Sequence, residues 1–231
     1  MNYLITGASK GIGYDTALKL AQNPGHTILA ISRNEEGLQD LAQAIKKQSG
    51  HQNIYYKVFD IINDDFTVLQ SWVQSFGSLN GIVNNAGLLI NKPFEQLTKN
   101  DWTLTFATNL FGVVHLIQAL LPLLENAHII NIGSMGGFQG SSKFPGLSAY
   151  SASKAALANL TECLAEEFKD RKITVNCLAL GAVQTSMLEG AFPGYKAPVT
   201  SHQMGEWVAW FLENGSNLFN GKVIPVSVST P

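Results

Sequence analysis

Residues 6–13 read Thr-Gly-Ala-Ser-Lys-Gly-Ile-Gly and follow directly on an apolar run at 3–5. At this spacing Gly7 permits a tight turn, Gly11 lets backbone approach a pyrophosphate, and Gly13 lets a helix pack closely on the strand. A helical pattern begins at once, so its first free N–H groups would face the phosphates. A glycine cluster alone often marks a plain turn, but strand, glycine loop and helix in this order predict a dinucleotide-binding unit.

The alternation of strand and helix continues along the rest of the chain. Predicted strands lie at 3–6, 27–31, 54–59, 81–84, 128–132, 173–178 and 222–226. Predicted helices lie at 11–22, 35–48, 64–75, 101–124, 150–168 and 201–213. Most strand runs are apolar throughout, as expected for strands covered on both faces. The pattern predicts an α/β fold: a single doubly wound Rossmann-type domain, residues 1–231, with a mostly parallel seven-stranded sheet flanked by helices.

Composition limits the classes of partner. The net charge of -2 gives no basic surface for nucleic acid or for an anionic membrane, so we expect neither. The longest apolar run, 110–124, falls short of the roughly 20 residues that cross a bilayer and predicts a buried helix. Only 14% of the residues are charged, against about 25% in an average protein, which favours burial between subunits.

The amino terminus and the two cysteines indicate a cytoplasmic protein without a metal site. The chain opens without the basic and apolar pattern of a secretory signal, so we expect a cytoplasmic location. Cys163 and Cys177 show no metal-ligand spacing and no disulfide framework. We expect both to be small core residues.

Four motifs, taken in order, resemble one known family. They are the glycine loop, Asn84-Asn85-Ala86-Gly87 after the fourth predicted strand, Ser134 at the end of the fifth, and Tyr150 with Lys154 opening the next helix. Together they resemble the classical short-chain dehydrogenase/reductase family over nearly the whole chain. The resemblance implies a nicotinamide cofactor and a carbonyl or alcohol substrate, but it says little about which substrate.

Tyr150 and Lys154 stand four positions apart, so on a helix they lie on one face. A free phenol has a pKa of about 10, too high for efficient proton transfer near neutrality. A nearby ammonium stabilises the phenolate, so we expect Lys154 to lower the pKa of Tyr150 and the pair to be catalytic. Without the other motifs, a helix-start aromatic and a solvated lysine would be the simpler interpretation.

Ser134 and Asn109 complete the predicted catalytic set. Ser134 ends an apolar strand, which would put its hydroxyl near a carbonyl oxygen as charge develops there. Ser141, Ser142 and Ser148 are competitors, but they fall in what reads as a Gly/Ser-rich loop. Asn109 matches the family's fourth catalytic position, where an asparagine and local backbone hold a water that connects the lysine to solvent. A buried asparagine that satisfies its own helix is the alternative.

The end of the second predicted strand favours NADP(H) over NAD(H). An NAD site usually offers a carboxylate there, which binds the ribose hydroxyls and repels a 2′-phosphate. Here Arg33 stands beside Ser32, and Lys10 lies in the glycine loop, so two cations could converge on that phosphate. Both could also be ordinary exposed cations.

By resemblance, further residues would line the dinucleotide. Asp60 and Ile61 would flank the adenine, and Asn85, Ala86 and Gly87 would pass beneath the adenosine ribose. Val183 would offer backbone groups to the carboxamide and Thr185 a hydroxyl to the phosphate. The predicted cofactor-binding set is Gly7, Ser9, Lys10, Gly11, Ile12, Gly13, Arg33, Asp60, Ile61, Asn85, Ala86, Gly87, Tyr150, Lys154, Val183 and Thr185.

The resulting hypothesis is an NADP(H)-dependent carbonyl reductase, acting on a 3-oxoacyl thioester or a small ketone. The alternative is a non-catalytic dinucleotide-sensing protein on the same fold, which the intact tyrosine and lysine disfavour. Alanine-rich helix 150–168 and helix 101–124 resemble the family's contact across a two-fold axis, so we expect a homodimer or homotetramer. Residues 187–200 resemble a short substrate lid. Apolar candidates for the substrate pocket are Phe138, Phe144, Leu147, Met187, Phe192 and Tyr195.

Overall fold

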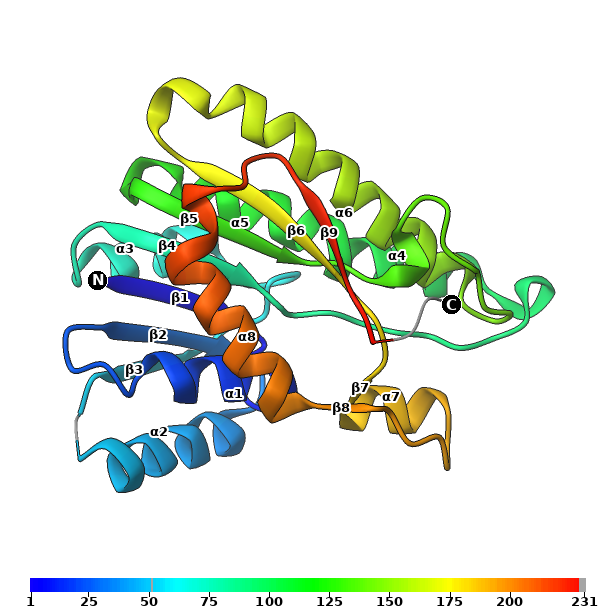
Figure 1. Ribbon diagram of the computed structural model, residues 1–231, viewed down its shortest axis with the longest axis horizontal. Coiled ribbons are helices and arrows are strands. Elements are labelled where there is room, and N and C mark those ends of the chain that lie inside the picture. Colours follow the sequence, from blue (N-terminus) through cyan, green and yellow to red (C-terminus); the bar gives the residue numbers. More distant parts are fainter. Residues whose placement is uncertain (51, 229–231) are drawn as a thin grey trace.

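A seven-stranded sheet runs through the computed structural model, which describes residues 1–50 and 52–228 (Figure 1). Its strands are β1 (Asn2–Thr6), β2 (Thr27–Ser32), β3 (Ile54–Val58), β4 (Leu79–Asn84), β5 (Leu124–Ile132), β6 (Thr174–Leu180) and β9 (Val223–Val226). The order is β3-β2-β1-β4-β5-β6-β9, and every neighbouring pair is parallel. The predicted fold class is confirmed. Residue 51 and residues 229–231 of the predicted domain lie outside the described residues.

Helices connect the strands and flank the sheet. They are α1 (Gly11–Leu20), α2 (Glu35–Ser49), α3 (Phe66–Gln74), α4 (Lys99–Phe106), α5 (Gly112–Leu120), α6 (Ser148–Glu167), α7 (Ser186–Ala191) and α8 (Ser201–Asn214). Short 3-10 turns are η1 (Phe94–Gln96), η3 (Leu121–Leu123), η4 (Met135–Gly137), η5 (Lys169–Arg171) and η6 (Gly215–Asn217).

Local signals explain where several helices begin and end. Asn34 precedes α2 and its side chain accepts a hydrogen bond from the backbone N of Gly37 at 3.0 Å. Gly50 ends α2 in the left-handed conformation, with φ of 71°. Thr98 and Asp101 form a reciprocal capping box at the start of α4. These contacts satisfy backbone groups that a helix end otherwise leaves unpaired.

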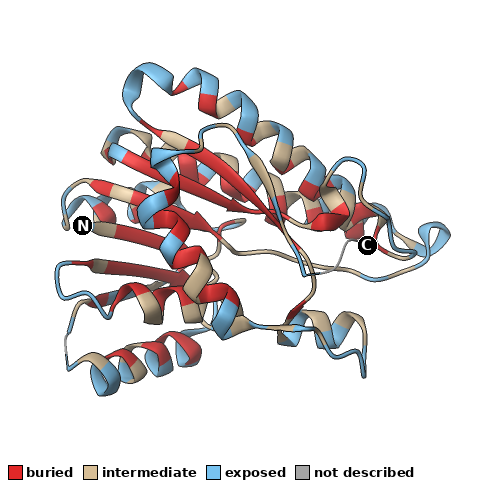
Figure 2. Cartoon of the chain, in the orientation of Figure 1, coloured by how far each residue is buried: buried red, intermediate tan, exposed pale blue. Residues whose placement is uncertain are grey.

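Two apolar clusters cover the two faces of the sheet, because successive residues of a strand point to opposite sides. Ile5 packs in the cluster that holds α1, α2 and α8, whereas Leu4 packs in the cluster that holds α3, α5 and α6. Figure 2 shows the strands buried between these layers and the outer helix faces exposed. The sheet is therefore covered on both faces, as its apolar strands predict.

The predicted helix 101–124 is divided in the structure. A π-helical turn, η2 (Ala107–Phe111), separates α4 from α5. By length and composition alone, the helical segment Lys99–Leu123 could cross a membrane. Its residues Val113, Leu116 and Leu120 pack in the cluster beneath the sheet, which is the arrangement of a core helix.

The segment after β6, which resembles a short lid in sequence, forms two strands and a helix. β7 (Val183–Gln184) pairs in parallel with β8 (Val199–Thr200), and α7 lies between them. Figure 1 shows this unit, in orange, apart from the main sheet and joined to the start of α8.

Candidate active site

A cleft of about 440 Å³ opens where the chain leaves the carboxyl ends of the strands. β1 lies between β2 and β4, so the strand order reverses at β1, and this is where doubly wound sheets bind ligands. The cleft has the size of an ordinary small-molecule site. Every residue of the predicted catalytic and cofactor-binding sets lines it except Gly13 and Asn109.

The glycine loop is held against the segment after β4. Gly7 has a φ of +65°, and a Cβ built there would lie 2.9 Å from the Cα of Ala86. The side chain of Asn85 donates to the carbonyl oxygens of Thr6 at 3.0 Å and Gly7 at 3.1 Å. Gly13 lies beneath this contact, because a Cβ there would come within 2.7 Å of the Gly7 oxygen. Only glycine fits at both positions, and the loop keeps its backbone open to a phosphate.

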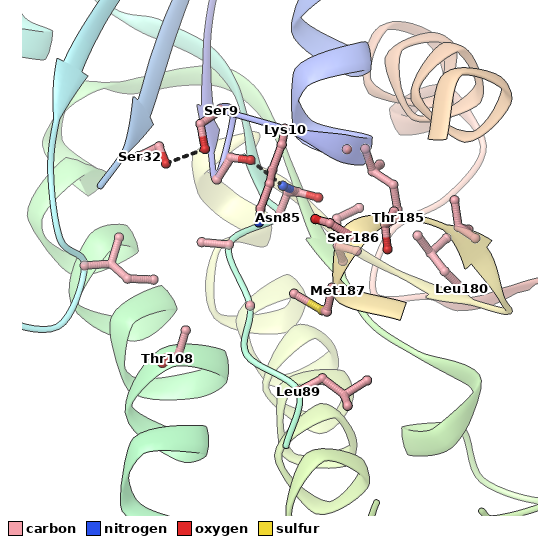
Figure 3. A pocket seen from close by; sticks show the side chains of 18 of the residues that line it. Ser9, Lys10, Ser32, Asn85, Leu89, Thr108, Leu180, Thr185, Ser186 and Met187 are labelled. Atoms are coloured by element: carbon pink, nitrogen blue, oxygen red, sulfur yellow. Dashed lines mark hydrogen bonds between the residues drawn. The ribbon is translucent and has the colours of Figure 1, made fainter. Parts of the chain in front are cut away.

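The end of β2 and the adjacent glycine loop offer cations and hydroxyls to the cleft, and among the described residues the end of β2 adds no carboxylate to its lining. Ser32 donates to the hydroxyl of Ser9 at 2.8 Å, and Figure 3 shows this bond with Lys10 nearby. Lys10 and Arg33 are exposed, line the cleft, and form no ion pair with any described residue. These groups fit a phosphate on the adenosine ribose, because they offer two free cations and two hydroxyls.

The remaining predicted cofactor residues lie along the same cleft. The Asp60 carboxylate accepts from the backbone N of Ile62 at 3.0 Å and from the Asn63 amide at 3.0 Å, which keeps it at the end of β3. The Thr185 hydroxyl accepts from the backbone N of Leu188 at 3.2 Å and so caps α7. A Cβ at Gly11 would lie 3.4 Å from the Thr185 methyl group, so Thr185 faces the glycine loop across the cleft.

Ser134, Tyr150 and Lys154 meet at the other end of the cleft. The Lys154 Nζ lies 6.0 Å from the centre of the Tyr150 ring and donates to the Ile132 carbonyl oxygen at 2.7 Å. The Ser134 oxygen accepts from the backbone N of Gly136 at 3.1 Å, which orients its hydroxyl at the start of η4. Of the competing serines, Ser141 bonds to backbone oxygens of its own loop, and none lines the cleft.

Burial dominates the electrostatics of this end of the cleft. It raises the pKa of Tyr150 above its ordinary value, and a hydrogen bond with Ser134 opposes the rise. Burial also lowers the pKa of Lys154 to about 8. The net shift in the pKa of Tyr150 is therefore upward, opposite to the direction expected from Lys154, because burial of the phenolate raises the pKa more than the hydrogen bond with Ser134 lowers it.

Asn109 lies beside the site and does not line the cleft. It is fully buried within the π turn η2. Its Oδ1 accepts from the backbone N of Leu88 at 2.7 Å, and its Nδ2 donates to the Leu88 carbonyl at 2.9 Å and to the Ser153 hydroxyl at 2.9 Å. The side chain thus secures the segment after β4 instead of satisfying its own helix. Its predicted part in a water relay stays a prediction.

Several residues of the cleft were not in the predicted sets. Ser32 stands beside the predicted Arg33, whereas Leu89 gave no signal because it lies in an irregular segment. Of the six apolar candidates for the substrate pocket, Met187 alone lines the cleft. Phe144 and Tyr195 are each 49% exposed, and Cys163, expected in the core, is exposed on α6. Within the described residues, no group of three His, Cys, Asp or Glu side chains could hold a metal ion.

Known proteins share both this sequence pattern and this fold. The 3-oxoacyl-[acyl-carrier-protein] reductase of Thermotoga maritima is 34% identical over 191 residues, which cover 80% of this chain and 75% of the relative. A putative short chain dehydrogenase of Escherichia coli CFT073 complexed with NADPH superposes with a TM-score of 0.86 at 29% identity, covering 97% of this chain and 95% of that one.

A putative short chain dehydrogenase of Shigella flexneri 2a complexed with NADP gives the same TM-score, identity and coverage. The family model described as short chain dehydrogenase matches residues 2–196, most of the chain. The glycine loop, the cleft at the strand reversal and the adjacent Ser134, Tyr150 and Lys154 agree with that match. The chain therefore belongs to the short-chain dehydrogenase/reductase family of oxidoreductases.

Proposed function

We propose that the protein is an NADP(H)-dependent oxidoreductase that interconverts a carbonyl compound and a secondary alcohol. Its substrate would be a 3-oxoacyl thioester or a small ketone. The observation that carries the proposal is the convergence of Ser134, Tyr150 and Lys154 at one end of a cleft whose other end fits a dinucleotide phosphate. The acyl-thioester substrate in the name of the Thermotoga relative supports the first choice.

The chain's own residues would manage the proton and the developing charge. The dinucleotide would supply or accept the hydride. Tyr150 would give its hydroxyl proton to the carbonyl oxygen during reduction and take a proton back during oxidation. Ser134 would donate a hydrogen bond to the same oxygen as negative charge develops there. The buried ammonium of Lys154 would stabilise the phenolate that Tyr150 leaves behind.

Removing the Tyr150 hydroxyl tests whether the protein is an enzyme or a dinucleotide sensor. We expect Tyr150→Phe to lower turnover at least about 100-fold, the usual scale of a lost general acid, while NADPH still binds. Tyr195→Phe is the matched control, because Tyr195 is half-exposed and does not line the cleft. NADPH binding is followed by its fluorescence. Unchanged turnover in Tyr150→Phe would refute the assignment of this residue.

Turnover itself is tested with a panel of ketones and acyl thioesters, offered with NADPH and with NADH. The loss of reduced-nicotinamide absorbance reports the reaction. Faster reaction with NADPH is expected, because Arg33 and Lys10 are free to bind a 2′-phosphate and the NADP-bound neighbours support that choice. If the dinucleotide binds but no compound is reduced, the result favours the hypothesis of a non-catalytic dinucleotide sensor.

We also propose that the protein forms a homodimer or homotetramer through α4, α5 and α6. Leu104 and Phe111 are 40% and 50% exposed on this helical segment, and the nearby face of α6 exposes Ala152 and Ala155. Burial of such a stripe between subunits is favourable. Light scattering should show an oligomer that Phe111→Lys dissociates and that Val68→Lys, on an exposed residue of α3, leaves intact. The cytoplasmic location and the absence of nucleic-acid and membrane partners stay predictions.

A further inference from the structure

The end of the cleft near Lys154 has apolar walls. The segment after β4 passes this lysine, because a Cβ at Gly87 would lie 3.7 Å from its Nζ. Leu89, from the segment after β4, lines this end of the cleft from one part of the chain, and Met187 and Leu188, from α7, line it from another. Figure 3 shows Leu89 and Met187 on these separate elements. The polar group that α7 adds is the uncharged hydroxyl of Ser186.

Charged side chains gather at the opposite end of the cleft. Among the described residues that line it, the charged ones are Lys10, Arg33, Asp60 and Lys154. The first three follow β1, β2 and β3, on the dinucleotide side. Lys154 is buried, and its ammonium already bonds to the Ile132 carbonyl oxygen. Within the described part of the chain, no cation at this end of the cleft is therefore left to pair with a carboxylate or phosphate on the substrate.

Both apolar walls are anchored. The side chain of Asn109 binds the backbone N and O of Leu88, immediately before Leu89. The amide of Asn91 donates to the Ala191 carbonyl at the end of α7, at 2.8 Å. The Gln184 side chain accepts from the backbone N of Ala197 at 2.8 Å, which closes the other side of the α7 unit. A bound substrate would meet fixed apolar surfaces, which favours preorganised binding of an apolar group.

We propose that this end of the cleft selects carbonyl compounds whose groups beside the reacting carbon are uncharged and apolar, and rejects their carboxylate and phosphate counterparts. An ionised group placed there would lose water without gaining an opposite charge, whereas an apolar group gains by leaving water. The inference rests on the proposed function, because it names the substrate class of the same site. An acyl ester or thioester meets the requirement, and a keto acid does not.

The test compares ethyl 3-oxobutanoate with freshly prepared 3-oxobutanoate, which share the reacting ketone and differ in one charge. We expect kcat/KM with NADPH to be at least about tenfold higher for the ester, equivalent to about 1.4 kcal/mol. Both compounds are also titrated by calorimetry into Tyr150→Phe saturated with NADPH, where turnover is blocked. Equal or tighter binding of the acid, or binding of neither compound, would overturn the proposal.

The two readouts separate this inference from the proposed function. If the ester binds selectively but wild-type protein reduces neither compound, the reductase assignment fails and the selectivity stands. If the acid is the better substrate, the reductase assignment stands and the selectivity fails.

A substitution at Met187, in the apolar wall, tests whether the missing cation causes the rejection of the acid. Met187 is 40% exposed, so Met187→Lys can be accommodated and should move the ester-to-acid ratio toward the acid by at least about tenfold. Met187→Leu, of similar size and no charge, should keep the wild-type ratio. An unchanged ratio in Met187→Lys would contradict the view that a missing cation causes the rejection.

Discussion

The ammonium nitrogen of Lys154 lies 2.7 Å from the carbonyl oxygen of Ile132 and donates a hydrogen bond to it. The bond ties α6 to the last residue of β5, so the lysine is positioned by the sheet as well as by its own helix. Ser134 follows β5 by two residues, and Tyr150 lies one turn before Lys154 on α6. The same contact therefore sets the relative place of all three side chains.

Removing this ammonium should lower turnover sharply. We expect Lys154→Met to lower kcat at least about 100-fold, because no buried cation then stabilises the Tyr150 phenolate. Lys169→Met, at an exposed lysine just after α6, is the control and should retain wild-type kcat. The measurement is steady-state turnover of the best ketone in the panel. Equal kcat in the two variants would contradict the role of Lys154.

At Gly7, the effect of the close contact with the Ala86 backbone should be separable from the effect of the positive φ. Gly7 and Gly50 both have positive φ, of +65° and +71°, but only Gly7 has neighbours that a Cβ would strike. Gly50→Ala should therefore cost about 1–2 kcal/mol, or about 2–8 °C in Tm, and leave NADPH binding intact. Gly7→Ala should lower Tm further and abolish binding, because the Ala86 backbone must move. Thermal melts and NADPH titrations of the two variants measure these effects. Equal changes in Tm and in NADPH binding would contradict the role of the close contact at Gly7.

A carboxylate at the end of β2 should reverse the cofactor preference. Ser32→Asp would put a negative charge beside the expected 2′-phosphate and offer oxygens to the ribose hydroxyls. We expect the ratio of kcat/KM for NADPH over NADH to fall at least about tenfold. Ser32→Asn has nearly the same shape without the charge and should shift the ratio much less. A common effect of both variants would indicate steric damage instead of electrostatics.

His128 should make the protein sensitive to acid. Burial lowers its pKa to about 4, and the hydrogen bond of its Nδ1 to the Leu212 carbonyl, at 3.0 Å, opposes this shift only in part. Its Nε2 faces the Asn176 amide, also at 3.0 Å, which carries no charge. An unfolded histidine has a pKa near 6.5. Between these values the unfolded chain binds more protons, so stability falls as pH drops from 6.5 toward 4.

The loss attributable to His128 should be on the order of 3 kcal/mol across that window. Urea unfolding of wild type and His128→Gln at several pH values measures it. The free energy of unfolding of the variant should change less steeply, because its side chain does not titrate. Parallel curves for the two proteins would show that His128 does not cause the acid sensitivity.

The predictable parts of the site are those that depend on local chain geometry. Gly7 and Gly11 indicate a turn with positive φ, and Gly13 indicates a close helix contact. Tyr150 and Lys154 share a helix face by spacing alone. Tertiary contacts decide the rest. Leu89 lines the cleft because Asn109, remote in sequence, binds the neighbouring backbone, and no local pattern encodes that bond.

The sequence patterns also did not predict how far individual side chains are buried. Cys163 has a small apolar side chain, yet it lies on the outer face of α6, where a second subunit is the expected cover. The raised pKa of Tyr150 likewise follows from the burial of the phenol against the cleft, which spacing does not reveal.

The π turn η2 bears on how far this protein tolerates changes of length. A π turn contains one residue more than an α-helical turn, and each residue of an α-helix adds about 100° of rotation. Deleting one residue between 107 and 111 would therefore convert the π turn into an ordinary α-helical turn and leave Leu116 and Leu120 facing the sheet that they now cover. The loss of a single codon there should therefore spare core packing and instead displace Asn109, whose side chain binds Leu88 and Ser153 beside the catalytic residues.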